Sequence, residues 1–230
     1  MTVNIFRFWA KIKPHQKIHP ADSAVFRRLG RNGHGLDLRC LPGSFGGPLR
    51  CAPVVLLYLS PGLSAPDFRH ARTPDGRKRY AWRRKGNAPL WAEDEHPTAH
   101  KWWVSRTKAF GIDPTILRRK VAVLNIGAYH SKRFTDYPLL ASLPSSRVSL
   151  EWAQAVLFPE AMRGERVVIC LRAAHFWGLA EGRRYGRSLF APRVTRGGHM
   201  RNKTPRDRKM RAAVIGAVHR AIGEKGAARS

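Results

Sequence analysis

Three short runs of continuous apolar residues constrain the fold of this chain more than any other sequence feature. They lie at 54–59 (VVLLYL), 121–126 (VAVLNI) and 166–171 (RVVICL), and a shorter run at 188–191 (SLFA) follows. Continuous rather than alternating apolarity is typical of strands that are covered on both faces, as in a parallel sheet. The intervening stretches are long enough for helical crossovers. The sequence therefore predicts an α/β fold with a mostly parallel central sheet of about four strands flanked by helices.

Helix signals and chain breakers divide the rest of the sequence. Ser145 or Ser146 is a candidate N-cap for a helix that continues to residue 162, and Gly164 is placed to end it. A closing helix is expected over residues 206–222. Glycines and prolines break any long pattern in the first fifty residues. We therefore expect an irregular basic N-terminal segment (1–50), an α/β domain (51–200), and a basic C-terminal helix and tail (201–230).

The chain is strongly basic along its whole length. Its 43 Lys and Arg residues face 15 acidic residues, which gives a formal net charge of +28. Residues 201–230 hold nine basic and two acidic residues, so a basic tail accounts for little of the excess. A GC-rich genome raises arginine content and explains part of it. The remainder is typical of a protein that binds the phosphates of nucleic acid, and we expect DNA rather than RNA.

Cysteine content and hydropathy limit the other classes. The chain has three cysteines, Cys40, Cys51 and Cys170. An odd number argues against a disulfide framework, and their spacing matches no zinc ribbon. Three thiolates are also one fewer than the four that usually hold an iron–sulfur cluster. We therefore expect no metal and no cofactor. No segment reaches the roughly 18 apolar residues of a membrane span, and the N-terminus lacks the features of a secretory signal. A cytoplasmic protein without a membrane partner is expected, and the oligomeric state stays open.

Polar residues collect where the expected strands end. In parallel sheets, ligands bind beyond the carboxyl ends of the strands. Those ends carry residues 60–62, 125–131, 172–175 and 192–199. The sequence therefore predicts a site at that edge of the sheet.

Four stretches, in order, resemble motifs of the uracil-DNA glycosylase superfamily. Residues 54–62 resemble its first motif, an apolar strand that leads into a Gly-x-(Asp/Asn)-Pro turn, and 121–125 resemble its strand with a base-reading Asn. Residues 166–178 resemble its strand followed by small residues and Trp-Gly, and 190–200 lie where the family has a loop with a His. The resemblance spans about 50–200 and implies a DNA-base glycosylase that extrudes a nucleotide from the helix.

The resemblance also assigns residue roles. Asn125 takes the base-reading position, and its amide offers both a donor and an acceptor; a structural Asn that braces the strand end is the alternative. His199 takes the position that stabilises the departing base, with His130 and His175 as competitors on the same edge. Pro61, Gly62 and Tyr129 are placed beside the base, although an aromatic residue at a strand end is often part of the core.

The sequence departs from the family pattern at the first motif. Ser60 stands where the family has its water-activating Asp or Asn, and Tyr58 replaces the leading Gly. A serine hydroxyl is no general base without an activating neighbour, so Ser60 is expected to position a water molecule. Asp67 is the nearest carboxylate, and an N-cap for the following helix is its simpler interpretation.

A densely basic stretch with interleaved aromatic residues suits contacts with a nucleic-acid backbone. A solvated loop is the alternative. The residues that we assign to backbone binding are Arg77, Lys78, Arg79, Arg83, Arg84 and Arg196. The sequence leaves two leading functions: a glycosylase-like enzyme that binds DNA and excises an altered base, or a nucleic-acid-binding protein on the same scaffold without catalysis. An enzyme acting on a free nucleotide or another small anion explains the widespread charge less well.

Overall fold

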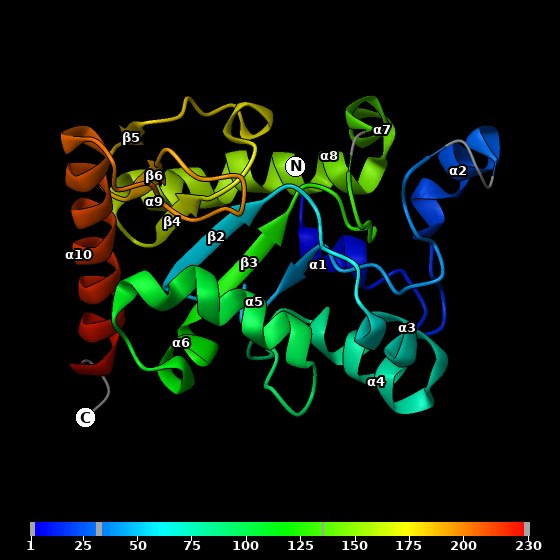
Figure 1. Cartoon of the computed structure of the whole chain (residues 1–230). Coiled ribbons are helices and arrows are strands. Elements are labelled where there is room, and N and C mark those ends of the chain that lie inside the picture. The colour runs from blue at the N-terminus through cyan, green and yellow to red at the C-terminus, as the bar shows by residue number, and fades with distance from the viewer. Residues whose placement is uncertain (1–2, 31–33, 135, 228–230) are drawn as a thin grey trace.

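A six-stranded mixed sheet forms the centre of the computed structural model, which describes residues 3–30, 34–134 and 136–227. Its order is β1-β3-β2-β4-β6-β5 (Figure 1). The strands are β1 (Phe45–Gly46), β2 (Val54–Tyr58), β3 (Val121–Asn125), β4 (Val167–Cys170), β5 (Arg183–Tyr185) and β6 (Leu189–Ala191). The four inner strands are parallel, and the short edge strands β1 and β5 pair antiparallel. The predicted mostly parallel α/β sheet is confirmed, with two short edge strands in addition.

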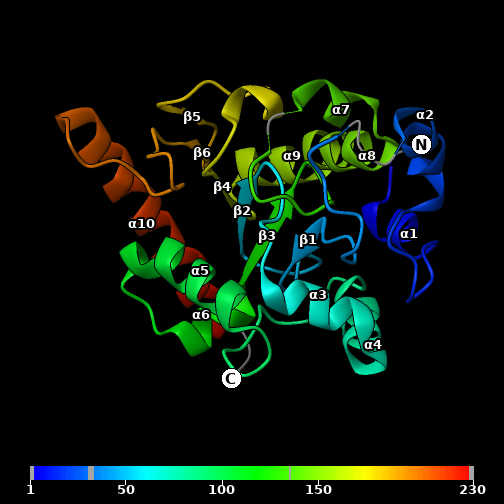
Figure 2. The ribbon, with the colours of Figure 1, turned by 45° about the vertical axis from the view of Figure 1, so that its right-hand side comes forward.

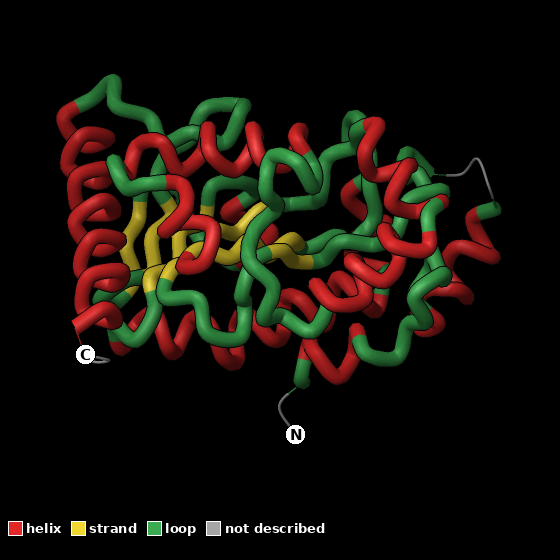
Figure 3. Tube along the Cα trace, turned by 90° about the horizontal axis from the view of Figure 1, so that it is seen from below, coloured by secondary structure: helices red, strands yellow, loops and turns green. Residues whose placement is uncertain are grey.

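Helices cover both faces of this sheet, as the view from below shows (Figure 3). They are α1 (Ile5–Trp9), α2 (Ser23–Leu29), α3 (Ala65–Arg72), α4 (Pro74–Arg83), α5 (Pro97–Thr107), α6 (Pro114–Lys120), α7 (Tyr137–Ser142), α8 (Pro144–Trp152), α9 (Phe158–Arg163) and α10 (Pro205–Ala227). One apolar cluster joins a sheet face to α1, α8 and α9, and a second joins the other face to α5, α6 and α10. The two layers are separated clearly in Figure 2.

The packing of β2 against both helical layers explains why its sequence is continuously apolar. Side chains alternate between the faces of a strand. Val55 and Leu57 belong to the cluster under α1 and α8, whereas Val54 and Leu56 belong to the cluster under α5 and α10. All five residues of the strand are buried. Both faces therefore lie in apolar surroundings, as the absence of alternation predicts.

The N-terminal segment is more ordered than its sequence indicates. Residues 1–50, expected to be irregular, contain α1, α2 and β1 in their described part. Ile5 and Trp9 are buried in the same cluster as β2 and β4, and α1 packs on α8. Glycines and prolines mark the loops of this segment correctly, but the apolar run at its start forms a core helix. The segment therefore completes one layer of the domain.

The two predicted helices are present with small differences. A continuous helical stretch runs through α8, a π-helical turn over Ala153–Leu157, and α9. It ends at Gly164, which has φ of 88°, a left-handed conformation that glycine adopts without steric cost. The helix starts at Pro144, so Ser145 and Ser146 lie in its first turn and neither is the N-cap. Helix α10 spans the predicted C-terminal helix, and residues 228–230 of the predicted tail lie outside the described residues.

Candidate functional site

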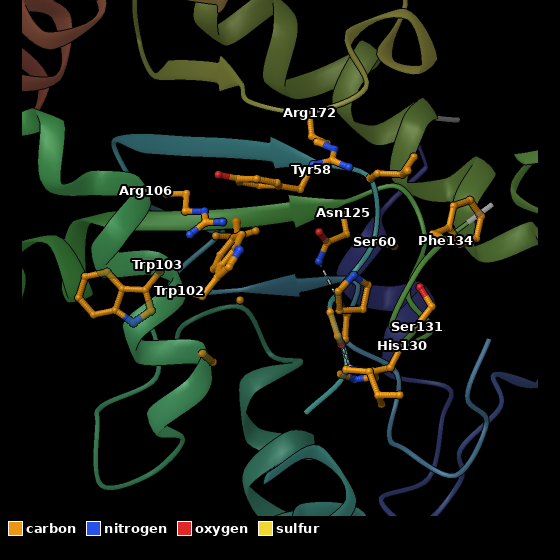
Figure 4. A pocket seen from close by; sticks show the side chains of 18 of the residues that line it. Tyr58, Ser60, Trp102, Trp103, Arg106, Asn125, His130, Ser131, Phe134 and Arg172 are labelled. Carbon is orange, nitrogen blue, oxygen red and sulfur yellow. Dashed lines mark hydrogen bonds between the residues drawn. The ribbon is translucent and has the colours of Figure 1, made fainter. Parts of the chain in front are cut away.

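A cleft of about 1120 Å³ lies at the carboxyl ends of the parallel strands. The segments after β2, β3, β4 and β6 all contribute to its lining, and α4 and α5 supply the facing wall. Figure 4 shows residues of α5 on one side of the cleft and the segments that follow β2 and β3 on the other. The topology therefore brings the predicted strand ends together, and the cleft is at the predicted edge.

The lining combines positive charge with aromatic rings. Eight Lys or Arg residues and two carboxylates line the cleft, an excess of six formal positive charges: Arg83, Arg84, Arg106, Lys132, Arg133, Arg172, Arg196 and Arg201 against Asp67 and Glu181. The aromatic lining residues are Phe45, Tyr58, Tyr80, Trp91, Trp102, Trp103, Phe134, Tyr137 and Phe176. Cationic side chains attract phosphates, and aromatic faces stack on bases of any sequence.

Ser60 and Asn125 lie in this lining, with Pro61 and Gly62. Asn125 is the last residue of β3, and its Nδ2 donates a hydrogen bond to the Gly43 carbonyl oxygen at 3.2 Å. That bond fixes the amide, so Asn125 does brace the strand end. The same residue faces the cleft (Figure 4), and both interpretations of Asn125 are compatible with its position.

Asp67 is the most constrained carboxylate of the cleft. It is 6% exposed and forms a capping box with Ser64 at the start of α3. The N-cap is Ser64, and Asp67 lies at N3 rather than at the N-cap position that its simpler interpretation predicts. His96 Nε2 lies 2.9 Å from Oδ1, and the Tyr80 hydroxyl donates to the same oxygen at 3.3 Å. The Ser64 hydroxyl donates to Oδ2 at 2.6 Å. These groups, with His130, form the Asp67 cluster.

The charges and hydrogen bonds of the cluster keep Asp67 ionised. Burial alone would raise the pKa of its carboxyl, but the hydrogen bond from His96, the charge of His130 and the Ser64 hydroxyl outweigh burial and lower the pKa to about 2. His96 is the N-cap of α5, and its Nδ1 accepts a hydrogen bond from the Ala99 amide. Its Nε2 therefore carries the ring proton and donates the hydrogen bond to Asp67. Asp67 is therefore held as a structural anion, and no lone pair is directed at a substrate water.

His130 connects this cluster to the strand ends. Its Nδ1 lies 2.6 Å from the Gly62 carbonyl oxygen, and its Nε2 lies 3.0 Å from that of Leu41. Carbonyl oxygens only accept, so both contacts are hydrogen bonds when both ring nitrogens carry a proton. Nδ1 is also 3.8 Å from Asp67 Oδ2. The ring of His130 therefore connects the turn after β2, through Gly62, to the segment of Leu41, and it lies beside the Asp67 carboxylate.

Two arginines hold the loop that follows β6 over the cleft. Arg106 of α5 donates to the Gly197 carbonyl oxygen at 2.8 Å, and Arg172 donates to that of Arg196. Gly198 in this loop has φ of 79°, and a Cβ there would lie 3.1 Å from the ring of Tyr58. The close approach of loop and ring therefore requires glycine. The Tyr58 hydroxyl is buried and has no hydrogen-bond partner among the described residues.

Aromatic residues form the opposite rim. Tyr137 stacks on Phe176 with ring centroids 5.0 Å apart and planes inclined by 18°, and Phe134 meets Tyr137 edge-on. Tyr137 is 44% exposed, which is unusual for an aromatic side chain of this size next to a cleft. Nearby, Ala173 has φ of 54°, a left-handed conformation that residues with a Cβ rarely adopt. This turn lies between Arg172 and His175, which both line the cleft.

Tyr129 is not part of the site, contrary to the sequence-based assignment. It is 2% exposed, and its hydroxyl donates to Asp22 Oδ2 at 2.5 Å and accepts from the His19 amide at 3.1 Å. Its ring packs against Phe26 of α2. The alternative, a core aromatic residue, is therefore correct. The N-terminal segment covers this position, which a strand-end argument alone does not reveal.

The basic stretch forms helices rather than a solvated loop, and its residues have different surroundings. Arg77 donates to the carbonyl oxygens of Ala71 and Arg72, and Arg79 pairs with Glu95 at 2.6 Å. Lys78 is exposed on α4. Arg83 and Arg84 are buried and line the cleft. The expected single surface for phosphates is therefore not formed by these residues.

His199 and Arg196 lie on the loop after β6, but only Arg196 is among the residues that line the cleft. His199 is half-buried, and burial together with the charge of Arg106 lowers its pKa. His130 and His175, its competitors in the sequence, do line the cleft. Because both ring nitrogens of His130 already lie against carbonyl oxygens, the geometry favours the exposed His175 over His199 for contact with a bound group.

Several lining residues were missed by the sequence analysis. Trp102 and Arg106 are four residues apart on α5, a spacing that places both on one helix face. The Arg106 guanidinium lies 5.6 Å from the Trp102 ring centre. That spacing was visible in the sequence. His96 was not predictable in the same way, because its contact with Asp67 joins residues 29 positions apart.

No protein-family model matches this chain, and no curated protein sequence matches it. Among the described residues, no group of three or more His, Cys, Asp or Glu side chains is arranged to hold a metal ion. No helix in the described ranges is both long and apolar enough to cross a membrane. The fold and the cleft define the class: an α/β protein with a cleft lined by cationic and aromatic side chains at its parallel strand ends.

Proposed function

We propose that this chain is a DNA-base glycosylase-like protein, which binds DNA and receives one extruded nucleotide in the cleft. The observation that carries the proposal is the lining itself, in which eight cationic and nine aromatic side chains surround the strand ends that carry Ser60 and Asn125. Small-molecule sites typically have volumes of roughly 300–1000 Å³. A cleft of about 1120 Å³ accommodates a nucleotide but not a duplex, so a base has to leave the stack to enter.

Excision would be a hydrolysis. Water adds to C1′ of the sugar, the N-glycosidic bond breaks, and its electron pair leaves with the base, which takes up the proton lost by the water. Ser60 positions the water, Asn125 contacts the base edge, and the cationic lining stabilises the negative charge on the leaving base. The resemblance to the uracil-DNA glycosylase superfamily, carried by the four motifs, supports this assignment.

A specific observation favours the second candidate, nucleic-acid binding without excision. A general base would have to replace the Asp or Asn that Ser60 displaces. Asp67 is held by His96, Tyr80 and Ser64, and its low pKa makes it a weak base. Glu181 is the other carboxylate of the lining. The site therefore binds a base more readily than it activates water.

One assay separates the candidates. Duplexes with uracil, hypoxanthine or a methylated base at one position are incubated with the protein and then treated with alkali. Strand scission at that position, lost in Asn125→Ala, is expected for the enzyme. If the protein binds all duplexes but no scission occurs, the non-catalytic candidate holds. Absence of DNA binding at 50 mM salt would contradict both.

A further inference from the structure

The guanidinium group of Arg83 is buried, and the described chain offers no hydrogen-bond acceptor to its Nη atoms. Its side chain is 5% exposed, and neither Nη1 nor Nη2 has a hydrogen-bond partner among the described residues. One face of the guanidinium lies on the Trp91 ring, 3.7 Å from its centre. A buried cation without a hydrogen-bonded counterion is strongly unfavourable. The stack on Trp91 fixes the plane of the group, and its two Nη atoms lie covered from solvent without a hydrogen-bond partner in the described chain.

The nearby carboxylates are committed elsewhere. Glu95 receives Arg79 and Arg118 at 2.6 and 3.0 Å, and its Oε2 also accepts from the Ala92 amide. Asp67 is held within its cluster. Burial lowers the pKa of Arg83 to about 10, with Tyr80 and Glu95 acting in the opposite direction, so the group is still charged at neutral pH. No carboxylate among the described residues therefore forms a hydrogen bond with Nη1 or Nη2 of Arg83.

The surroundings of the guanidinium belong to the cleft. Nη2 lies 3.9 Å from the place where a Cβ on Gly46 would be, and Gly46, Leu90 and Trp91 all line the cleft. Arg84, the next residue, is also buried, lines the same cleft, and has both Nη atoms without partners. An entering group therefore meets the buried positive charge of Arg83 at this wall.

We propose that Arg83 forms an oxyanion subsite within the cleft, in which its two Nη groups donate to two oxygens of one phosphate while Trp91 supports the guanidinium plane. Planar guanidinium groups match pairs of phosphate oxygens. The subsite is a property of the protein without DNA, and free inorganic phosphate is a sufficient probe. The same chemistry is offered by a phosphodiester of a nucleic-acid strand, which would extend the proposed function.

The test measures thermal unfolding of the full chain in sodium phosphate from 0 to 20 mM, with sodium chloride added to keep ionic strength constant. The wild-type Tm is expected to rise by about 3 °C, the shift that a ligand at about five times its Kd gives a domain of this size. Arg83→Met removes an unpaired charge but keeps the apolar contact with Trp91. Its Tm without phosphate is expected to be above that of the wild type, and its response to phosphate to be lost.

Lys85→Met is the matched control, because it removes one positive charge from an exposed position two residues after Arg83 that does not line the cleft. It is expected to keep the phosphate response, and Arg83→Lys to lose most of it, since an ammonium group does not offer two parallel donors. If the wild type does not respond, or if Arg83→Met is less stable than the wild type and still responds, the subsite proposal is wrong.

A competition arm distinguishes the two sources of the oxyanion. Phosphate at constant ionic strength is added to the complex of the protein with a short single-stranded DNA. A weakening of DNA binding in the wild type that is absent in Arg83→Met identifies the strand's own phosphate as the occupant. Equal DNA affinity at all phosphate concentrations, with the Tm response intact, identifies free phosphate or a phosphate monoester. DNA binding without any phosphate response would refute the subsite and leave the proposed function standing.

Discussion

Two groups of polar side chains in the same cleft differ in one respect, the extent to which the protein satisfies them. In the Asp67 cluster, the carboxylate oxygens and the ring nitrogens of His96 and His130 all have partners within the chain. Tyr58, Arg83 and Arg84, which we call the unpaired group, have buried polar atoms without partners in the described chain. Buried polar atoms normally have hydrogen bonds. From this difference we infer that the cluster supports the cleft, and we propose that the unpaired group contacts a ligand.

The largest expected effect tests the supporting role. Asp67→Ala removes the capping box and leaves His96 Nε2 and the Tyr80 hydroxyl without their acceptor. We expect a loss of about 4 kcal/mol in the free energy of unfolding, because the helix loses its cap and two buried donors lose their acceptor. Urea denaturation followed by circular dichroism measures it. A loss below about 1 kcal/mol would show that the cluster is not what holds this wall.

An acid titration tests the contribution of Asp67 to stability by changing its charge. The folded-state pKa of Asp67 is about 2, below its ordinary value of 3.8, so its contribution is fully present above pH 4 and is lost as the pH falls from about 4 to 2. The shift corresponds to about 2 kcal/mol. The wild type is expected to lose more stability over this interval than Asp67→Asn. Parallel curves for the two proteins would contradict the assignment.

A matched pair of tyrosines compares the two groups directly. Tyr80 donates to Asp67 at 3.3 Å, whereas the Tyr58 hydroxyl is buried without a partner. Tyr80→Phe is expected to cost about 1 kcal/mol, and Tyr58→Phe to be neutral or slightly stabilising, because it removes an unsatisfied group. Urea denaturation of the wild type and of each variant measures the two changes in the free energy of unfolding. The reverse order of the two costs would remove the distinction on which this comparison depends.

The smallest expected effect concerns the histidine assignments. His175 lines the cleft and is exposed, whereas His199 lies outside the lining. His175→Ala is expected to weaken binding of single-stranded DNA about twofold to threefold, as one polar contact at an exposed site does. His199→Ala is expected to leave the affinity unchanged. Fluorescence anisotropy with a labelled oligonucleotide resolves the difference, and an effect confined to His199→Ala would restore the sequence-based assignment.

Much of the framework was predictable because it follows from local patterns. Continuous apolarity identified the four parallel strands, and their parallel direction placed Ser60 and Asn125 at one edge. Asp67 indicated a helix N-terminus, although Ser64 and not Asp67 is the N-cap. These features need only neighbours in sequence or the general rule for strand ends. They account for the location of the cleft.

The chemistry of the cleft depends on contacts that no local pattern contains. Tyr129 is drawn into the core by Asp22, which is 107 residues away. The burial of Arg83 depends on Trp91 and on the close approach of Gly46, and the acceptor of His96 is Asp67 on another helix. Sequence alone therefore located the site but could not divide its residues into supporting and available groups.

The central claim is that nucleic acid docks in the cleft and not on the basic surface at large. Binding of a single-stranded oligonucleotide is measured between 50 and 200 mM salt for the variant Lys132→Gln/Arg133→Gln/Arg196→Gln, which changes exposed residues of the cleft. The control, Arg206→Gln/Lys209→Gln/Arg220→Gln, removes the same charge from exposed positions on α10. The cleft variant is expected to lower the salt slope by about two, roughly 0.7 for each lost phosphate contact, and the α10 variant to change it little. Equal slopes for the two variants would contradict the claim.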